Sequence, residues 1–483
     1  MNFSVIKRTI GWLLLFEAAF FILPTITAIC YGEWYELYAF ILSIIICAGL
    51  GGFCLIGKEK NKEMFAKEGL IIVSLSWIIL SIFGALPFWF SRCIPSYIDA
   101  LFETVSGFTT TGSSIMPTGE SVEALPKCML MWRSFTHWVG GMGVLVFVMA
   151  FLPLSGGRNM YIMKAESPGP SVGKLVPKVR TTAKILYTIY LGLTVIELIL
   201  LLCGGMSLFE ALNTAFATAG TGGFSFKADG FAGFNSYLQV VVAVFMLVFS
   251  INFNSYYFLL KRRWKEVLTA EVKTFLIIVF VAVGLITANV FLTDTITNFG
   301  SALKHSLFSV ATVISTTGFV TEDFNLWPTL SKIILVLLMF IGACAGSTGG
   351  GIKVSRILIL GKSASNDMRK ALHPKQVTRL TIDGRVVETE VVQSVYSFLV
   401  SYMLLFVVSV LIISIEGESL VTTFTSVAAT INNIGPGLDA VGPVGTFAHF
   451  SWWSKLVLIF DMLAGRLEIL PMLLLFAPAT WRK

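Results

Sequence analysis

Charged residues, histidines and paired cysteines are all scarce in this chain. Only 13% of its 483 residues are charged, and the four histidines, His137, His305, His373 and His449, are dispersed. The seven cysteines form no CxxC pair and have no histidine at zinc-site spacing, which argues against a zinc site and leaves apolar packing as their role. The largest polar loop, about 363–390, is short. We therefore expect no sizeable soluble domain.

Apolar residues make up 55% of the sequence, with 40 Phe and 11 Trp. An uncharged stretch of about 20 residues matches the hydrocarbon thickness of a bilayer. We find ten long apolar stretches, which predict ten transmembrane helices. They run approximately over 9–31, 35–57, 69–90, 128–154, 182–204, 235–260, 273–293, 329–345, 392–415 and 452–478.

The formal net charge of +7 is distributed unevenly along the chain. If the N-terminus is cytoplasmic and the spans alternate, most of the 35 Lys and Arg fall on the cytoplasmic side, mainly in 58–67, 158–184, 261–273 and 353–385. This is the positive-inside pattern of a multi-pass membrane protein, and it argues against a nucleic-acid partner. It places both termini in the cytoplasm, provided that four further segments enter the membrane from outside without crossing it.

Four short segments place a turn and a glycine between two long apolar spans. They are Thr110-Thr111-Gly112, Gly220-Thr221-Gly222, Thr316-Thr317-Gly318 and Asn433-Ile434-Gly435. Their last glycines are 110, 96 and 117 positions apart, which indicates a repeat of roughly a hundred residues. Each turn follows a helix-like segment that is too short to cross a bilayer. These segments are 97–108, 207–218, 299–313 and 418–431.

The repeat predicts an all-α integral membrane protein. Four units, each a span, a half-length helix and a return span, are expected in a pseudo-fourfold arrangement after an N-terminal helix pair. The expected boundaries are 1–68 for the pair and 69–157, 158–262, 263–375 and 376–483 for the four units. Non-helical backbone at membrane depth is tolerated only where it is buried in protein or lines a wet cavity. The four turns are therefore expected to face one axis.

The composition of the turns suits a dehydrated cation. Successive carbonyls and threonine hydroxyls can replace the water shell of such an ion. Glycine lets consecutive carbonyls turn toward one axis, and each short helix directs its partially negative C-terminal end at the centre. We expect a monovalent cation at the backbone carbonyls of Thr111, Thr221, Thr317 and Ile434. The alternative, ordinary small-residue packing between membrane helices, is disfavoured by four matched copies.

These segments resemble the Trk/Ktr/HKT superfamily of potassium-uptake proteins. The resemblance includes Gly346-Ser-Thr-Gly-Gly-Gly-Ile-Lys353 and Gly465-Arg466-Leu-Glu468, and covers the chain from about 69 to the end. The additional N-terminal pair of spans is similar to the bacterial Trk-type membrane subunit. The family implies one potassium selectivity filter per chain, built from the four turns, and Gly112 goes with potassium rather than sodium preference. One departure is Gly220 ahead of Thr221, where a hydroxyl side chain is expected.

The segment 345–351 is too rich in glycine for a helix interior, because each glycine costs about 1 kcal/mol there. It lacks the Gly-Lys-Ser/Thr sequence of a phosphate-binding loop, and no strand precedes it. We interpret it as a loop midway through the membrane, with a simple kink as the alternative. By resemblance it is an intramembrane gate. The implied gate residues are Gly346, Ser347, Thr348, Gly349, Gly350, Gly351, Lys353 and Arg466.

Several charged residues lie inside predicted membrane segments, where charge is costly and often functional. Arg466 is expected in the pore wall below the filter, and the alternative is a salt bridge to Asp461 or Glu468. Glu103 and Glu210 lie on the first two half-length helices. They either anchor neighbouring backbone or add negative field outside the filter.

The resemblance implies the potassium-translocating membrane subunit of a Trk-type uptake system in the bacterial inner membrane, a channel-like protein and not an enzyme. The resemblance implies K⁺ as the transported ion. No nucleotide site is visible in the chain, so any energy or ligand coupling is expected to come from a partner. By resemblance, a cytosolic TrkA-like ring that binds NAD or ATP docks on the basic loops near 158–184, 261–273 and 363–390, and the subunit forms a homodimer. The alternatives are a proton- or sodium-coupled symporter and an intramembrane hydrolase using Ser347 or Ser171, which lacks a convincing partner base.

Overall fold

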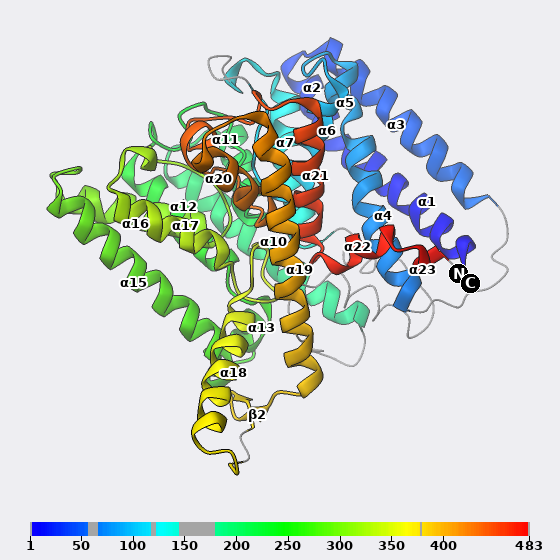
Figure 1. Ribbon diagram of the computed structural model, residues 1–483. Helices are drawn as coiled ribbons and strands as arrows, with labels where there is room; N and C mark the ends of the chain where they lie inside the picture. The colour runs from blue at the N-terminus through cyan, green and yellow to red at the C-terminus, as the bar shows by residue number, and fades with distance from the viewer. Residues whose placement is uncertain (1, 57–65, 117–121, 144–178, 377–378, 482–483) are drawn as a thin grey trace.

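The computed structural model describes residues 2–56, 66–116, 122–143, 179–376 and 379–481, and it is almost entirely helical (Figure 1). The second half of the predicted span 128–154, most of the basic loop 158–184 and Ser171 lie outside these residues. So do most of the basic residues of 58–67.

The described residues form the following α-helices, in chain order. The N-terminal helices are α1 (Phe3–Phe20), α2 (Ile22–Tyr31) and α3 (Trp34–Leu55). They are followed by α4 (Ala66–Gly84), α5 (Leu86–Phe90), α6 (Tyr97–Phe108), α7 (Lys127–Gly141), α10 (Val179–Cys203), α11 (Leu208–Ala219), α12 (Ser236–Phe249), α13 (Phe253–Leu260) and α14 (Trp264–Val267). The second half comprises α15 (Ala270–Leu292), α16 (Phe299–Ile314), α17 (Thr329–Phe340), α18 (Val354–Leu372), α19 (Thr389–Ile413), α20 (Leu420–Ile431), α21 (Trp452–Arg466), α22 (Leu470–Phe476) and α23 (Pro478–Trp481).

The four predicted half-length helices are confirmed as α6, α11, α16 and α20. Each begins at a polar N-cap side chain that accepts a hydrogen bond from the first turn. The caps are Ser96, Ser207, Asn298 and Ser419. Such caps satisfy backbone N–H groups that a helix start leaves without partners. At Ser207 the side chain of Glu210 completes a capping box, so Glu210 anchors local backbone.

The count of ten unbroken spans is not confirmed. Within the described residues, six helices are long and apolar enough to cross a membrane, or seven if α12 and α13 form one bent span. These two helices meet at 93°. The predicted span 329–345 ends as a helix at Phe340, and 452–478 is interrupted between Arg466 and Leu470. In each case apolar residues that are not helical follow the break, so hydropathy alone overstates helix length.

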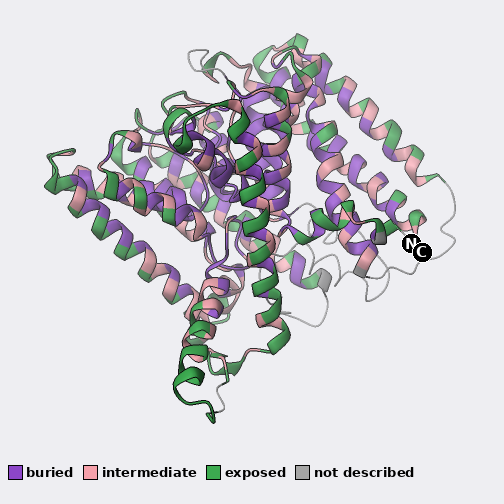
Figure 2. Cartoon of the chain, viewed as in Figure 1, coloured by how far each residue is buried: buried purple, intermediate pink, exposed green. Residues whose placement is uncertain are grey.

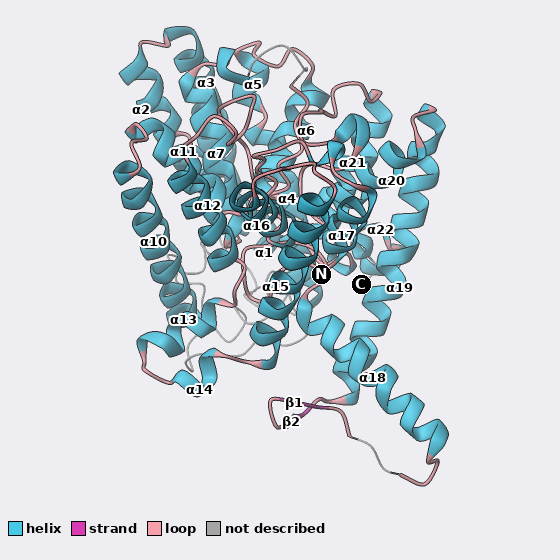
Figure 3. Ribbon diagram, turned by 90° about the vertical axis from the view of Figure 1, so that its left-hand side faces the viewer, coloured by secondary structure: helices cyan, strands magenta, loops and turns pink. Residues whose placement is uncertain are grey.

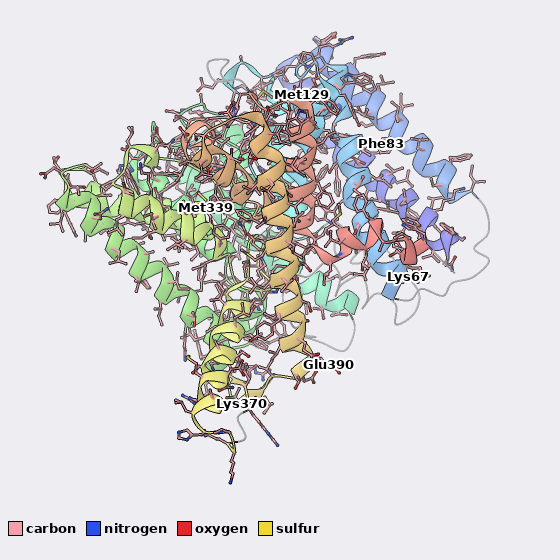
Figure 4. The ribbon with its side chains drawn as sticks, in the orientation of Figure 1. Lys67, Phe83, Met129, Met339, Lys370 and Glu390 are labelled. Carbon is pink, nitrogen blue, oxygen red and sulfur yellow. The ribbon has the colours of Figure 1, made fainter. Side chains whose placement is uncertain are left out.

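The burial pattern matches a membrane protein with a packed centre. Buried residues gather around α11, α16 and α20, whereas α3, α15 and α19 expose their outward faces (Figure 2). At one end α18 projects from the bundle beside a small antiparallel hairpin of β1 (Thr381–Ile382) and β2 (Arg385–Val386) (Figure 3). The predicted loop 363–390 is therefore partly ordered as helix and hairpin. Lys67, Lys370 and Glu390 lie toward this end, whereas Met129 lies at the other (Figure 4).

Helices α1 and α3 cross closely because glycines meet at their contact. A Cβ atom placed on Gly51 would lie 2.9 Å from the carbonyl oxygen of Gly11. The nearby Gly49 has no heavy atom within 4 Å of the equivalent position. The crossing therefore depends on Gly51 and not on the glycine content of α3 in general.

We predict that Gly51→Leu separates α1 from α3 and destabilises the protein by about 1–3 kcal/mol, as overpacking does. The measurement is the thermal unfolding midpoint of the detergent-solubilised protein. Gly49→Leu, on the same helix but facing open space, is the control and is expected to leave the midpoint unchanged. Equal midpoints for the two variants would contradict the close crossing.

Candidate functional site

The four half-length helices end in turns of the same backbone conformation. In each turn a residue with side chain adopts positive φ, and a glycine two positions later does so again. The first set is Thr110, Thr221, Thr316 and Asn433, with φ of 55°, 53°, 59° and 54°. The second set is Gly112, Gly223, Gly318 and Gly435, with φ of 82°, 77°, 93° and 100°. Positive φ at four matched positions explains the glycines.

The hydrogen bonds of the turns match as well. In every turn the N–H between the two positive-φ residues donates to the carbonyl five residues earlier, a helix-ending bond that folds the chain back on the helix. The donors Thr111, Gly222, Thr317 and Ile434 bond to Ser106, Ala217, Thr312 and Ala429 at 2.8, 2.9, 2.9 and 2.9 Å. We refer to these segments as the first to fourth turns.

This geometry corrects the register of the second turn by one residue. The counterpart of Gly112 is Gly223 rather than Gly222, and Thr221 is the counterpart of Thr110. The carbonyl assigned to Thr221 therefore belongs to Gly222. Two consecutive glycines conceal this register in the sequence. With the corrected register, Gly220 is the counterpart of Thr109, one residue before the turn.

The four turns contact one another in cyclic order. A Cβ atom built on Gly112 would lie 2.0 Å from the carbonyl oxygen of Gly222 in the second turn. The same construction on Gly223 reaches Thr317 O at 1.9 Å, on Gly318 reaches Ile434 O at 2.4 Å, and on Gly435 reaches Thr111 O at 2.9 Å. Each glycine thus packs on the carbonyl that precedes the next turn's glycine. No side chain larger than hydrogen fits this ring.

A cavity of about 340 Å³ opens on one side of the ring. Its lining includes all four ring glycines, Gly112, Gly223, Gly318 and Gly435. Polar groups of Ser113, Ser114, Ser225 and Asp229 also line it. A hydrated ion in this cavity therefore has direct access to the ring.

His137 forms hydrogen bonds with residues next to the first and second turns. The sequence did not predict this role. Its Nδ1 lies 2.8 Å from Gly107 O, and its Nε2 lies 3.2 Å from Phe224 N. Since the amide of Phe224 can only donate, Nε2 accepts and Nδ1 carries the proton. A Cβ on Gly222 would lie 2.2 Å from the imidazole ring. The neutral ring thus fixes the spacing between α6 and the second turn.

A buried ion pair joins the same two turns above His137. Arg133 and Glu103 are 2.7 Å apart, with side chains 3% and 0% exposed. Glu103 also accepts the N–H of Ile115 at 3.1 Å, and Arg133 donates to Ser225 O at 3.2 Å. Its guanidinium stacks on Phe224, 4.1 Å from the ring centroid. Glu103 is therefore a backbone anchor.

Side chains also connect the fourth turn to the first. Asn433 Nδ2 donates to Thr111 Oγ1 and to Met462 O, both at 2.9 Å. Ser113 Oγ donates to Gly435 O at 3.0 Å. These bonds close the ring between segments more than three hundred residues apart in sequence.

Residues 341–353, here the glycine loop, interrupt the third unit as the sequence predicted. Ile341 and Ile352 pair as a parallel bridge, so the two ends of the loop lie together. Cys344 N donates to Ser250 O at 3.0 Å, and Phe253 N donates to Gly346 O at 3.0 Å. The loop therefore satisfies backbone groups that the bend between α12 and α13 leaves without helical partners.

The glycine loop lies against the ring. Gly350 N donates to Thr316 Oγ1 at 2.7 Å, and a Cβ on Gly350 would lie 2.5 Å from Asn432 O. Lys353, which is 2% exposed, donates to the carbonyls of Gly349 and Gly350. Lys353 is thus a buried part of the loop.

Arg466 joins the glycine loop to the first unit. It donates to Thr348 O at 2.8 Å, Gly140 O at 2.6 Å and Gly141 O at 2.7 Å. Glu468 pairs instead with Arg356. The space left between the loop and α21 is only about 10 Å³. The described residues of the loop therefore pack closely against Arg466 and α21.

Glu271, the second residue of α15, connects the glycine loop to the first turn of α18. Its Oε1 accepts the N–H of Ala345 at 2.7 Å and that of Ser355 at 3.1 Å. The preceding residue, Ala270, donates its N–H to Asp383 Oδ1 at 2.9 Å, in the turn of the β1–β2 hairpin. The loop is therefore linked through α15 to a hairpin outside the helix bundle.

The arrangement offers little for hydrolytic or metal chemistry. Ser347 Oγ donates to Cys344 O at 2.6 Å, which leaves its hydroxyl without a base in the described contacts. Among the described residues no three His, Cys, Asp or Glu side chains gather as a metal site. Within the described residues, the site presents a ring of backbone carbonyls next to a cavity of about 340 Å³, with the glycine loop packed against the ring.

Re-entrant turns around one centre define a polytopic membrane protein of the cation-transport class. The family model TrkH, described as a cation transport protein, matches residues 37–483, and the chain belongs to this family of transporters, which are not enzymes. The match begins at 37 and so extends beyond the region from 69 that the motifs indicated.

Named relatives agree over the whole chain. The Trk system potassium uptake protein TrkH of Escherichia coli K12 is 34% identical over 492 residues, covering 100% of both chains. TrkG of the same strain is 32% identical over 484 residues, covering 99% of this chain and 98% of its own. The crystal structure of the potassium transporter TrkH from Vibrio parahaemolyticus superposes with a TM-score of 0.88 at 32% identity, covering 100% of both chains.

We predict that Arg133→Gln destabilises the protein by roughly 3–5 kcal/mol, because it leaves the buried carboxylate of Glu103 without its counter-ion. The double variant Glu103→Gln/Arg133→Gln removes both charges and is expected to be clearly less destabilised than Arg133→Gln. Thermal unfolding of the wild type, both single variants and the double variant completes the cycle. Additive losses would mean that the two charges do not depend on each other.

Proposed function

We propose that this chain is the potassium-translocating membrane subunit of a Trk-type uptake system. The relatives that it matches over its full length are potassium uptake proteins. The observation that carries the proposal is the cyclic contact of the four turns, in which each glycine packs on the carbonyl before the next glycine. Four inward carbonyls with no intervening side chains replace ion hydration as a selectivity filter does.

The proposed filter comprises the residues of the four turns with the second in its corrected register. It includes Thr110, Thr111, Gly112, Thr221, Gly222, Gly223, Thr316, Thr317, Gly318, Asn433, Ile434 and Gly435. K⁺ is the transported ion, held by the carbonyls of Thr111, Gly222, Thr317 and Ile434. The C-terminal ends of α6, α11, α16 and α20 meet at this point, and their partial negative charge favours a cation.

We place each filter segment within one pore unit, with the boundaries 69–157, 158–262, 263–375 and 376–483, and both termini in the cytoplasm of a bacterial cell. The orientation is supported by the basic loops. The first and last described helices, α1 and α23, lie close together (Figure 1), and α18 with the hairpin carries Lys362, Arg369 and Lys370 away from the bundle (Figure 3). The 340 Å³ cavity is then the external entrance.

The glycine loop is the proposed gate, and we assign the arrangement described here to its closed state. Its support is the contact of Gly350 with Thr316 and Asn432, together with the bonds of Lys353 and Arg466 to loop carbonyls. A fixed positive charge on the permeation axis also opposes cation passage. Opening of the gate requires water to replace these hydrogen bonds. We propose that the free energy for this step comes from a binding event on the cytosolic side.

The cytosolic event is proposed to come from a TrkA-like ring that binds NAD or ATP and docks on the basic loops, acting on a homodimer of this subunit. Support comes from the relatives' description as parts of a Trk system and from the link between the hairpin and Glu271. A coupled symporter is the second candidate, because Asp461 is a fully buried carboxyl, hydrogen-bonded to Ser409, and intramembrane carboxyls serve ion coupling in transporters. Single-channel recording distinguishes the two: unitary conductance supports a pore, and fixed ion stoichiometry supports a symporter.

Replacing Gly318 by Ser is predicted to abolish potassium preference. The new Cβ would lie 2.4 Å from Ile434 O at a φ of +93°, so the ring must widen, and the K⁺-to-Na⁺ flux ratio is expected to fall at least tenfold, about 1.4 kcal/mol. The measurement is cation flux into proteoliposomes. Gly417→Ser is the matched control, since Gly417 has a φ of +81° but no atom within 4 Å.

Unchanged cation preference in Gly318→Ser would remove the four turns from the proposed filter. An equal loss of preference in Gly417→Ser would attribute the effect to backbone strain rather than to the ring.

Replacing Glu271 by Ala is predicted to release the glycine loop. The N–H groups of Ala345 in the loop and Ser355 in α18 lose bonds to a charged acceptor, each worth roughly 1.5–3 kcal/mol. We expect at least a tenfold rise in K⁺ flux in proteoliposomes without a partner protein. Glu266→Ala, on the neighbouring α14 and paired with Arg263, is the control and should leave flux at the wild-type level. A Glu271→Ala protein that folds but shows no rise would exclude the loop as the closed gate.

A further inference from the structure

A second cavity of about 580 Å³ lies between α17 and α20, on the periphery of the fourth turn. Its walls are formed largely by Ile333, Val336, Leu337 and Val421. Ile333, Leu337 and Val421 remain 51%, 59% and 47% exposed, so this wall faces the bilayer rather than protein. The volume lies within the range of about 300–1,000 Å³ that is typical of ligand sites. We refer to this cavity as the α17–α20 slot.

One end of the slot carries the ammonium of Lys332 and the carboxylate of Asp439. Asn325 forms hydrogen bonds with both residues. Lys332 Nζ donates to Asn325 O at 3.1 Å, and Asn325 Oδ1 accepts the N–H of Asp439 at 2.9 Å. The hydroxyls of Ser419 and Thr422 donate to the carboxylate of Asp439, and these bonds lower the pKa of Asp439. An ammonium and a carboxylate thus lie on either side of one asparagine at the mouth of an apolar slot.

We propose that the α17–α20 slot binds one phospholipid whose headgroup carries a phosphate and a primary ammonium. The acyl chain occupies the apolar walls formed by Val336 and Leu337. Lys332 binds the phosphate, as basic groups between membrane helices bind lipid headgroups. The ammonium donates to Asp439.

Charge complementarity identifies the occupant. A free phosphate gains nothing from the apolar walls, and an anionic lipid without an ammonium leaves the carboxylate of Asp439 facing like charge. A choline headgroup has the positive charge but no N–H to donate. Phosphatidylethanolamine has an acyl chain for the apolar walls, a phosphate for Lys332 and a primary ammonium for Asp439. The site is distinct from the ring, which Lys332 and Asp439 do not contact in the described structure.

The residue proposed to bind the lipid headgroup, Asp439, lies only a few residues after the fourth turn. Asp439 follows Leu438, whose N–H donates to Thr425 Oγ1 at 3.0 Å, and Gly437 N donates to Val441 O at 2.7 Å. These residues continue from Pro436 and Gly435. A headgroup bound to Asp439 therefore holds the segment that leaves the fourth turn, and ion flux is expected to depend on this lipid.

The test is native mass spectrometry of the full chain titrated with phosphatidylethanolamine, phosphatidylcholine or phosphatidylglycerol. We expect one tight phosphatidylethanolamine per protomer and weaker binding of the other two lipids. Leu337→Trp, which fills the slot, should abolish the tight site, and Lys332→Gln should weaken it about fivefold. The matched controls are Ile277→Trp on the exposed face of α15 and Lys304→Gln on α16, and both should bind as the wild type does.

Equal binding of the three lipids would overturn the headgroup assignment and with it the proposal. Retention of the tight lipid by Leu337→Trp would place it elsewhere. The same spectra report the oligomeric state, so a dimer lost only in Leu337→Trp, without a change in lipid binding, would show that a second copy of the chain fills the slot. Potassium selectivity is measured separately on Gly318→Ser, so failure here leaves the proposed filter untouched.

Discussion

The structure depends on one constraint, that backbone polar groups at membrane depth must find partners inside the protein. At the start of each half-length helix, a polar N-cap side chain accepts a hydrogen bond from a backbone N–H group. At its end, N–H groups of the following turn donate to carbonyls of the helix. The carbonyls of Thr111, Gly222, Thr317 and Ile434 then point to where the next turn's glycine packs. We propose that a cation is the partner of these four carbonyls, because carbonyl oxygens replace the hydration shell of an ion in a selectivity filter.

The same constraint explains why the glycine loop lies where it does. The 93° bend between α12 and α13 frees backbone groups that the loop satisfies, and the loop in turn offers carbonyls that Lys353 and Arg466 satisfy. Backbone groups freed at one helix break thus form hydrogen bonds with groups freed at another. Because these bonds depend on one another, the loop can leave this conformation only if water replaces them together. The proposed gate is therefore expected to have two states rather than a graded constriction.

Much of this architecture could be predicted from the sequence, because it follows from segment length and local chemistry. The short helix 97–108 could not cross a bilayer, and it is present as α6. The register of Gly222 and Gly223 could not be fixed, since two adjacent glycines satisfy the same pattern. The bend after Phe249 has no proline or glycine to announce it, so 235–260 was predicted as one span. His137, a lone histidine with no motif, and Arg133, thirty residues from Glu103, gain their roles only from tertiary contacts.

The most direct measurement of the central claim is the position of a heavy potassium analogue. Crystals grown in Rb⁺ or Tl⁺ give an anomalous signal that locates the ion independently of the protein density. The account predicts a peak on the axis between the carbonyls of Thr111, Gly222, Thr317 and Ile434, and its replacement by K⁺ in competition. A peak at any other place, with the centre of the four turns empty at saturating ion, would contradict it.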